Sequence, residues 1–179
     1  MLRDERPTLS GEHYQVTDAI NQPPPVGSIP LMIGGSGEKK TLRMVAQYAD
    51  ESNLTAPVDE VPRKLDALAA HCERLGRDRS EIQVSKHLNV CIAETHDQAY
   101  AEGSAFLAAR GLDLATMDDA TREMVLSLII MGDPDHVGEE LTSIMDLGLD
   151  GITASLPANG HIPGRVELLG RTASAVLGV

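Results

Sequence analysis

The chain has 179 residues, 42% of them hydrophobic and 23% charged, which is the composition of a globular protein with room for one buried core. Its formal net charge of −12 opposes the basic surface that nucleic-acid binding requires, and it opposes docking on an anionic membrane. There is no apolar run of about 18 residues for a transmembrane helix, and the first residues lack the apolar stretch of a signal peptide. We therefore expect a cytoplasmic protein with neither nucleic acid nor membrane as a partner.

Cysteine and histidine spacing points away from metal chemistry. Cys72 and Cys91 form no CxxC motif, and the six histidines form no HxxxH pair. We expect two buried thiols and no metal site.

Apolar strands alternate with amphipathic helices after a polar start. Residues 1–28 end in three prolines, which predicts an irregular N-terminal arm, and residues 29–179 are predicted to form one α/β domain. Strands are predicted at 29–33, 52–56, 82–93 and 151–156. Helices are predicted from about 38 to 49, 59 to 75, 134 to 147 and from 163 onward, with two more at 97–110 and 121–131. The last two resemble an insertion. Asp59 and Asp133 are the predicted N-caps of the helices that follow them, and the inward side of the last helix is predicted to consist of Val166, Leu169, Ala173 and Val176. Four β/α units make half of a (β/α)₈ TIM barrel.

Residues 82–93 show a period of two. Val84, Leu88 and their even-numbered neighbours face one way, whereas His87 and Asn89 face the other, which would be the barrel interior. These two residues are candidates for the site, and the alternative is a hydrogen-bonded core pair. His161 follows the last strand and is a weaker candidate, because a surface position explains it equally well.

A glycine-rich loop carries the clearest chemical signal. Gly34, Gly35, Ser36 and Gly37 lie between a buried strand and a helix, where unpaired N–H groups can approach an anion closely. Lys39 and Lys40 add positive charge. The loop lacks Walker A spacing, so on this pattern alone a structural turn is as good an interpretation as a phosphate site.

The surrounding sequence resembles a known family. The luciferase-like family, and within it the type that uses coenzyme F420, is similar to this chain in Ile29 to Leu54 (IPLMIGGSGEKKTLRMVAQYADESNL), in Glu5 to Val26 and in Gly132 to Ile152. The resemblance implies the C-terminal half of a TIM barrel with the cofactor at its mouth. It implies that Gly34 and Gly35 face the cofactor phosphate, that Ser36 and Gly37 continue the loop, and that the Thr55 hydroxyl binds the same phosphate. Lys40 is a further contact by the same reasoning, or a solvated lysine.

The resemblance also implies a function. It implies an F420-dependent oxidoreductase that transfers a hydride between the deazaflavin and a small organic substrate. The alternatives are an FMN-dependent monooxygenase and a non-catalytic flavin-binding or assembly half-barrel. Full-length members are nearly twice as long, and their first half supplies most catalytic groups, so no catalytic residue is assigned here. We expect a truncated form or a stand-alone half, and a homodimer or a complementing chain that closes the barrel.

Overall fold

A computed structural model describes residues 6–178, which divide between Leu31 and Met32 into two compact units. The first unit contains a short antiparallel hairpin of β1 (Leu9–Ser10) and β2 (Gln15–Val16), and the Gly11 N–H donates to the Tyr14 carbonyl to close its turn. Apart from this hairpin, which the sequence did not predict, the described part of the unit has no helix or strand.

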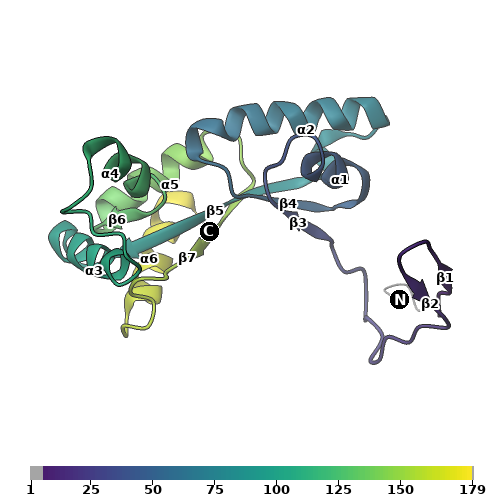
Figure 1. Ribbon diagram of the computed structural model, residues 1–179, viewed down its shortest axis with the longest axis horizontal. Coiled ribbons are helices and arrows are strands. Elements are labelled where there is room, and N and C mark those ends of the chain that lie inside the picture. The colour runs from purple at the N-terminus through teal and green to yellow at the C-terminus, as the bar shows by residue number, and fades with distance from the viewer. Residues whose placement is uncertain (1–5, 179) are drawn as a thin grey trace. The chain divides into compact units, whose positions relative to one another are not determined.

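The second unit consists of four β/α units around a parallel sheet (Figure 1). β5 is central, with β4 followed by β3 on one edge and β7 on the other. The strands are β3 (Met32–Gly34), β4 (Glu51–Leu54), β5 (Gln83–Ile92) and β7 (Gly151–Ser155), and the following helices are α1 (Thr41–Tyr48), α2 (Val61–Leu75), α5 (Pro134–Met145) and α6 (Arg165–Leu177). This is the predicted half-barrel order.

An insertion separates β5 from α5 and contains α3 (His96–Ala108), α4 (Asp119–Leu126) and the short strand β6 (Ile130–Gly132). The predicted helix over 121–131 is therefore wrong at its end. An apolar run as short as Ile129–Met131 has no periodicity that separates a helix from a buried strand, and pairing with Val90–Ile92 decides for the strand.

The hydrogen bonds of β5 show where β6 lies. The N–H groups of Gln83 and Ala93 donate to Asp50 in front of β4 and to Gly132 of β6, respectively. Successive N–H groups of a strand point to opposite edges, so residues ten apart share an edge. β4 and β6 thus follow one another along the same edge of β5. Because β4 pairs only up to Lys86 and β6 only from Val90, this edge has a gap in its pairing.

The helix ends have identifiable causes. Gly76 ends α2 in the left-handed conformation, with φ of 66°. Asp133 caps α5 as predicted, because its carboxylate accepts the His136 N–H at 3.0 Å, and Pro134 occupies the first helical position. Asp59 does not cap α2 as predicted. It lies inside a single 3₁₀ turn (Val58–Glu60) that precedes the helix.

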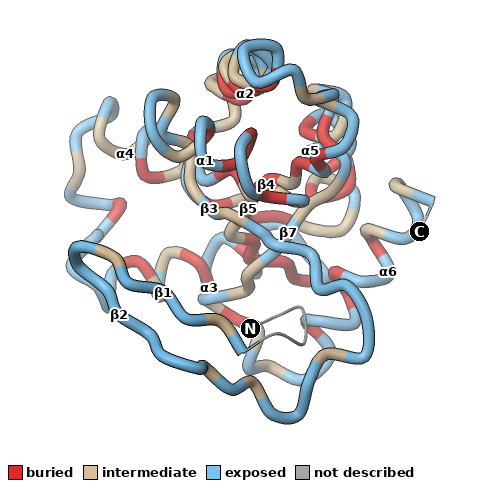
Figure 2. Tube along the Cα trace, turned by 90° about the vertical axis from the view of Figure 1, so that its right-hand side faces the viewer, coloured by how far each residue is buried: buried red, intermediate tan, exposed pale blue. Residues whose placement is uncertain are grey.

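The core lies between the sheet and the helices (Figure 2). The even-numbered apolar residues of β5, namely Val84, Leu88, Val90 and Ile92, belong to one cluster with side chains of α1, α2, α5 and α6, as the period of two predicted. A second cluster lies under the insertion and contains Cys91, Leu107, Leu114, Val125, Ile129 and Met131. On α6 the predicted inward residues Val166 and Val176 are exposed, since Leu168, Leu169 and Thr172 form the buried side.

Membrane-spanning helices and metal-binding clusters are both absent from residues 6–178. None of their helices combines the length and the apolar character needed to cross a bilayer. These same residues hold no group of three or more acidic, histidine or cysteine side chains arranged to bind a metal ion.

Candidate functional site

The glycine-rich loop begins where β3 ends. Gly34 is the last residue of the strand, and the Gly35 N–H donates to the Asn53 carbonyl of β4 at 2.9 Å. Gly35 has φ of 116°, a conformation that residues with a Cβ rarely adopt. The neighbouring strand and the glycine together turn the chain sharply at the carboxyl edge of the sheet.

Ser36 ties this loop to the end of β4. Its Oγ accepts the N–H groups of both Thr55 and Ala56, each at 2.8 Å. The oxygen is thus used within the protein, and only the hydroxyl proton remains for a ligand. The tether brings Thr55 beside the loop, as the resemblance implied, although the two positions are 19 residues apart. The Thr55 side chain is exposed and makes no hydrogen bond to the described residues.

The loop leaves a run of backbone donors without partners. From Ser36 to Lys40, no backbone N–H donates to another residue within positions 6–178, and the first bond of the helix start is from Leu42 to the Gly37 carbonyl. Lys40 occupies the N-cap position of α1 without a side-chain cap. Unpaired donors at a helix start carry partial positive charge and favour an anion.

Gly37 keeps this run of donors open. A Cβ placed on it would lie 3.0 Å from the Thr41 Oγ1, closer than ordinary packing allows. The Lys40 side chain is exposed and forms no ion pair with the described residues. Gly34–Gly37, Thr55 and Lys40 therefore gather at one edge of the sheet. The arrangement can hold a phosphate through backbone N–H groups and hydroxyls.

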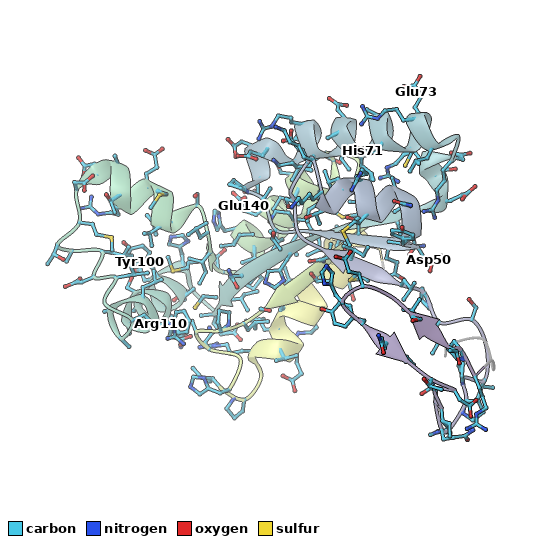
Figure 3. All side chains as sticks on the ribbon, turned by 45° about the vertical axis from the view of Figure 1, so that its right-hand side comes forward. Asp50, His71, Glu73, Tyr100, Arg110 and Glu140 are labelled. Carbon is cyan, nitrogen blue, oxygen red and sulfur yellow. The ribbon has the colours of Figure 1, made fainter. Side chains whose placement is uncertain are left out.

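An ion-pair network that the sequence pattern did not predict anchors the loop to α2. The Lys64 Nζ lies 2.8 Å from carboxylate oxygens of both Glu38 and Glu60, and its side chain is only 8% exposed. Arg63 adds a contact to Glu38 at 3.3 Å. Figure 3 shows His71 on the side of α2 that faces α1, and its Nε2 lies 2.7 Å from the Glu38 carbonyl oxygen. Lys64 and Arg63 thereby neutralise the Glu38 carboxylate, which lies next to the glycine-rich loop, and hold it toward α2.

This network should make the stability of the loop region depend on pH. The hydrogen bond from Lys64 lowers the pKa of both Glu38 and Glu60 below the usual 4.5. A carboxyl group whose pKa is lowered on folding stabilises the protein above its unfolded pKa, and this contribution disappears as the pH falls through the folded value. We expect Glu38→Gln to lower the free energy of unfolding at pH 7 and to have a smaller effect near pH 3, measured by urea denaturation across this range.

Glu81→Gln is the matched control, because Glu81 pairs with Arg77 on the surface and is 60% exposed. Its effect at pH 7 should be smaller than that of Glu38→Gln. A Glu38→Gln effect of equal size at both pH values would show that the carboxylate charge is not what stabilises the loop.

A polar row crosses the face of the sheet that turns away from the core. The Asn53 Nδ2 donates to the hydroxyls of Ser85 and Thr153, each at 2.8 Å, and the Thr153 Oγ1 lies 3.4 Å from the His87 Nδ1. The row spans β4, β5 and β7. His87 points to this face as predicted. Asn53 and Thr153 were not predicted, although their place on strands of the sheet was the available signal.

The two remaining candidates, Asn89 and His161, make no hydrogen bond to the polar row among the described residues. The Asn89 Nδ2 donates to the Leu128 carbonyl at 3.2 Å, so its side chain is bound to the insertion. His161 lies in the exposed turn after β7 and makes no hydrogen bond to the residues that the structure describes. The alternative expected for His87 and Asn89, a hydrogen-bonded core pair, is not found among the described residues, since each bonds to a different partner. His161 has the surface position that was its alternative.

The family profile of the luciferase-like monooxygenases matches residues 1–151. The chain belongs to this family. An F420-dependent glucose-6-phosphate dehydrogenase of Microbacterium testaceum (strain StLB037) is 27% identical over 161 residues, which are 80% of this chain and 47% of that protein. The chain thus spans about half the length of this relative.

Solved structures of the family show the same fold. An F420-dependent secondary alcohol dehydrogenase in complex with an F420-acetone adduct superposes with a TM-score of 0.71 at 14% identity, over 97% of this chain and 56% of that chain. EDTA monooxygenase from Chelativorans sp. BNC1 superposes with a TM-score of 0.69 at 17% identity, over 96% and 49%. The coverage is that of half a luciferase-like barrel.

Proposed function

We propose that this chain is the phosphate-binding half of an F420-dependent oxidoreductase. The observation that carries the proposal is the run of unpartnered backbone N–H groups from Ser36 to Lys40 at the carboxyl edge of a luciferase-like sheet. Parallel α/β sheets bind ligands at this edge. When bound, the deazaflavin would supply hydride transfer to or from a small organic substrate.

The residues of this chain would bind and orient the cofactor. Backbone N–H groups of the loop would donate to the phosphate oxygens, together with the hydroxyl protons of Ser36 and Thr55. Lys40 would add charge from the start of α1. Gly35 and Gly37 would let the main chain come close, because neither places a Cβ against the anion. No described residue is assigned to the chemical step.

F420 is preferred over FMN because the relative matched by sequence is named for F420. The FMN-dependent alternative stands because the loop would hold the phosphate of either cofactor, and monooxygenases share the fold. A non-catalytic flavin-binding protein is the third hypothesis, and it stands because no described residue is assigned to the chemical step.

The test is a fluorescence titration of the full chain with F420 and FMN, each paired with its phosphate-free counterpart, deazariboflavin or riboflavin. We expect saturable binding of F420, at least tenfold tighter than that of deazariboflavin, because only the phosphate engages the loop. Equal affinity for the two members of a pair would contradict a phosphate site. Tighter binding of FMN than of F420 would favour the monooxygenase alternative, and F420 binding without turnover of electron acceptors would favour the non-catalytic one.

We also propose that a second copy or a complementing chain covers the polar row. Its side chains Asn53, Ser85, His87 and Thr153 lie on the sheet face that a closed barrel would enclose. Apolar side chains at the β3 edge are also half exposed, Leu31 at 47% and Met32 at 49%. Light scattering on the titration samples gives the oligomeric state, and a stable monomer would contradict this part of the proposal.

A further inference from the structure

A cavity of about 420 Å³ lies between the insertion and the loop that follows β4. Its floor is β5 from Lys86 to Asn89, and its walls come from residues 55–58, the α4–β6 segment and the facing sides of α3 and α5. Figure 3 labels one residue from each of the last two elements, Tyr100 of α3 and Glu140 of α5. Small-molecule sites typically have volumes in the range of about 300–1,000 Å³.

The cavity exists because the pairing of β5 is interrupted on this edge. β4 pairs with β5 up to Lys86, β6 begins at Val90, and the backbone of His87 lies in between. No strand pairs with β5 on this edge at His87, and the His87 carbonyl accepts a hydrogen bond from the Lys86 Nζ at 2.6 Å instead. A buried lysine thus satisfies the open sheet edge and at the same time borders the cavity.

Lys86 carries a positive charge that no protein group balances. The residue is 5% exposed, and no carboxylate within residues 6–178 lies within ion-pair distance of its Nζ. Only one of its three N–H bonds has a protein acceptor among these residues. Burial lowers its pKa, with no opposing contribution from a neighbouring acid. A buried charge without a partner is costly, and an anion that entered the cavity would offset that cost.

The other walls indicate what the rest of the ligand is like. The side chains of Leu88, Leu126, Leu128, Ile129 and Ile144 supply apolar surface. His96 and His136 meet edge to face with ring centroids 5.4 Å apart and also line the cavity. Glu140 also lines the cavity, but it is exposed and forms no ion pair with Lys86.

We propose that this cavity binds a small carboxylate with an apolar body, whose carboxylate pairs with the Lys86 ammonium. The site is distinct from the glycine-rich loop, although Thr55 and Ala56 line the cavity and also donate their N–H groups to Ser36 of the loop. The inference therefore does not depend on the cofactor. If the proposed oxidoreductase function holds, a ligand in this cavity lies beside the cofactor loop and is a candidate substrate.

The test uses hexanoate as the probe and hexanamide as its neutral counterpart, both added to the full chain without cofactor. Binding is followed by two-dimensional NMR of the labelled protein. We expect hexanoate to shift the amide signals of residues 86–89 and 128–131 saturably, and hexanamide to bind at least tenfold more weakly. Lys86→Met should weaken hexanoate binding at least tenfold. Arg171→Met is the control, because Arg171 is exposed on α6 and lies outside the cavity, and hexanoate should bind this variant as tightly as the wild type.

Lys86→Met replaces a buried ammonium with an apolar side chain of similar length, so thermal unfolding should show a folded protein of at least equal stability. The inference is overturned if hexanoate produces no saturable shifts, if hexanamide binds equally well, or if the Lys86→Met protein retains wild-type affinity. F420 binding in the titration described above is independent of these outcomes, so the two proposals can fail separately.

Discussion

Replacing Glu102 with leucine is expected to lower the free energy of unfolding by about 3 kcal/mol, because it leaves a buried guanidinium without a counter-charge. Glu102 of α3 binds the Arg165 Nη2 and the Asn159 Nδ2, each at 2.7 Å. The side chains of the ion pair are only 9% exposed for Arg165 and 21% for Glu102. Burial alone would raise the pKa of Glu102, but the hydrogen bonds from Asn159 and Arg165 outweigh it and the pKa is lowered. The insertion is thereby bound to the turn between β7 and α6.

Urea denaturation followed by circular dichroism measures this loss. The double variant Glu102→Leu with Arg165→Met should recover most of it, since no charge is then left buried. Asp119→Ala is the control for an exposed ion pair. Asp119 is 99% exposed in its pair with Arg122, and its replacement should cost less than about 1 kcal/mol. A Glu102→Leu effect no larger than that of Asp119→Ala would show that the buried pair does not hold the insertion.

Gly37→Val is expected to weaken F420 binding at least tenfold while leaving the fold intact. Its Cβ would lie 3.0 Å from the Thr41 Oγ1, so the added side chain would crowd the start of α1 beside the unpartnered N–H groups. The loss follows from steric exclusion of the phosphate. It should therefore be much smaller for deazariboflavin, which has no phosphate to place there.

Two further variants separate this effect from destabilisation. Gly170→Val is the matched control, because a Cβ on Gly170 of α6 would meet nothing within 4 Å. Gly37→Ala adds a single methyl group and should give an intermediate loss of F420 affinity. If Gly37→Val binds F420 as tightly as the wild type does, the phosphate is not held by this loop, even where the titration shows that the cofactor binds.

The sequence predicted the order of the elements but not the insertion. The period of two in β5 was unambiguous because Val84 and Leu88 face a core while Ser85 and His87 do not. The prediction of a helix at residues 130–132 was wrong because so short an apolar run has no periodicity. Pairing with the free edge of Val90–Ile92 makes this run a strand. The prediction that Val166 and Val176 face inward was wrong because the buried side of α6 depends on the elements that pack against it, which a helical period does not specify.

The parts of the candidate site that are continuous in sequence could be predicted, whereas the contacts between residues far apart in sequence could not. Gly34–Gly37 form a continuous motif, and its position between strand and helix indicates an anion site. Glu38, Lys64 and Glu60 are far apart in sequence or look like ordinary helix-surface charges, so their shared network depends on how α2 packs over the loop. The same limit applies to Lys86. A lysine within an alternating strand gives no sign that the pairing of the strand stops beside it.

The Ser36 Oγ accepts the N–H groups of Thr55 and Ala56, and these two hydrogen bonds hold the loop to the end of a strand that is close in sequence. Everything that shapes the loop apart from the α2 network, namely β3, α1, β4 and the serine tether, lies within one continuous stretch of chain from 32 to 56. Such a stretch behaves as a cassette. We expect that it can be exchanged between barrels as a unit, together with the phosphate affinity that we propose for its loop, while the parts that hold the reactive ring vary independently.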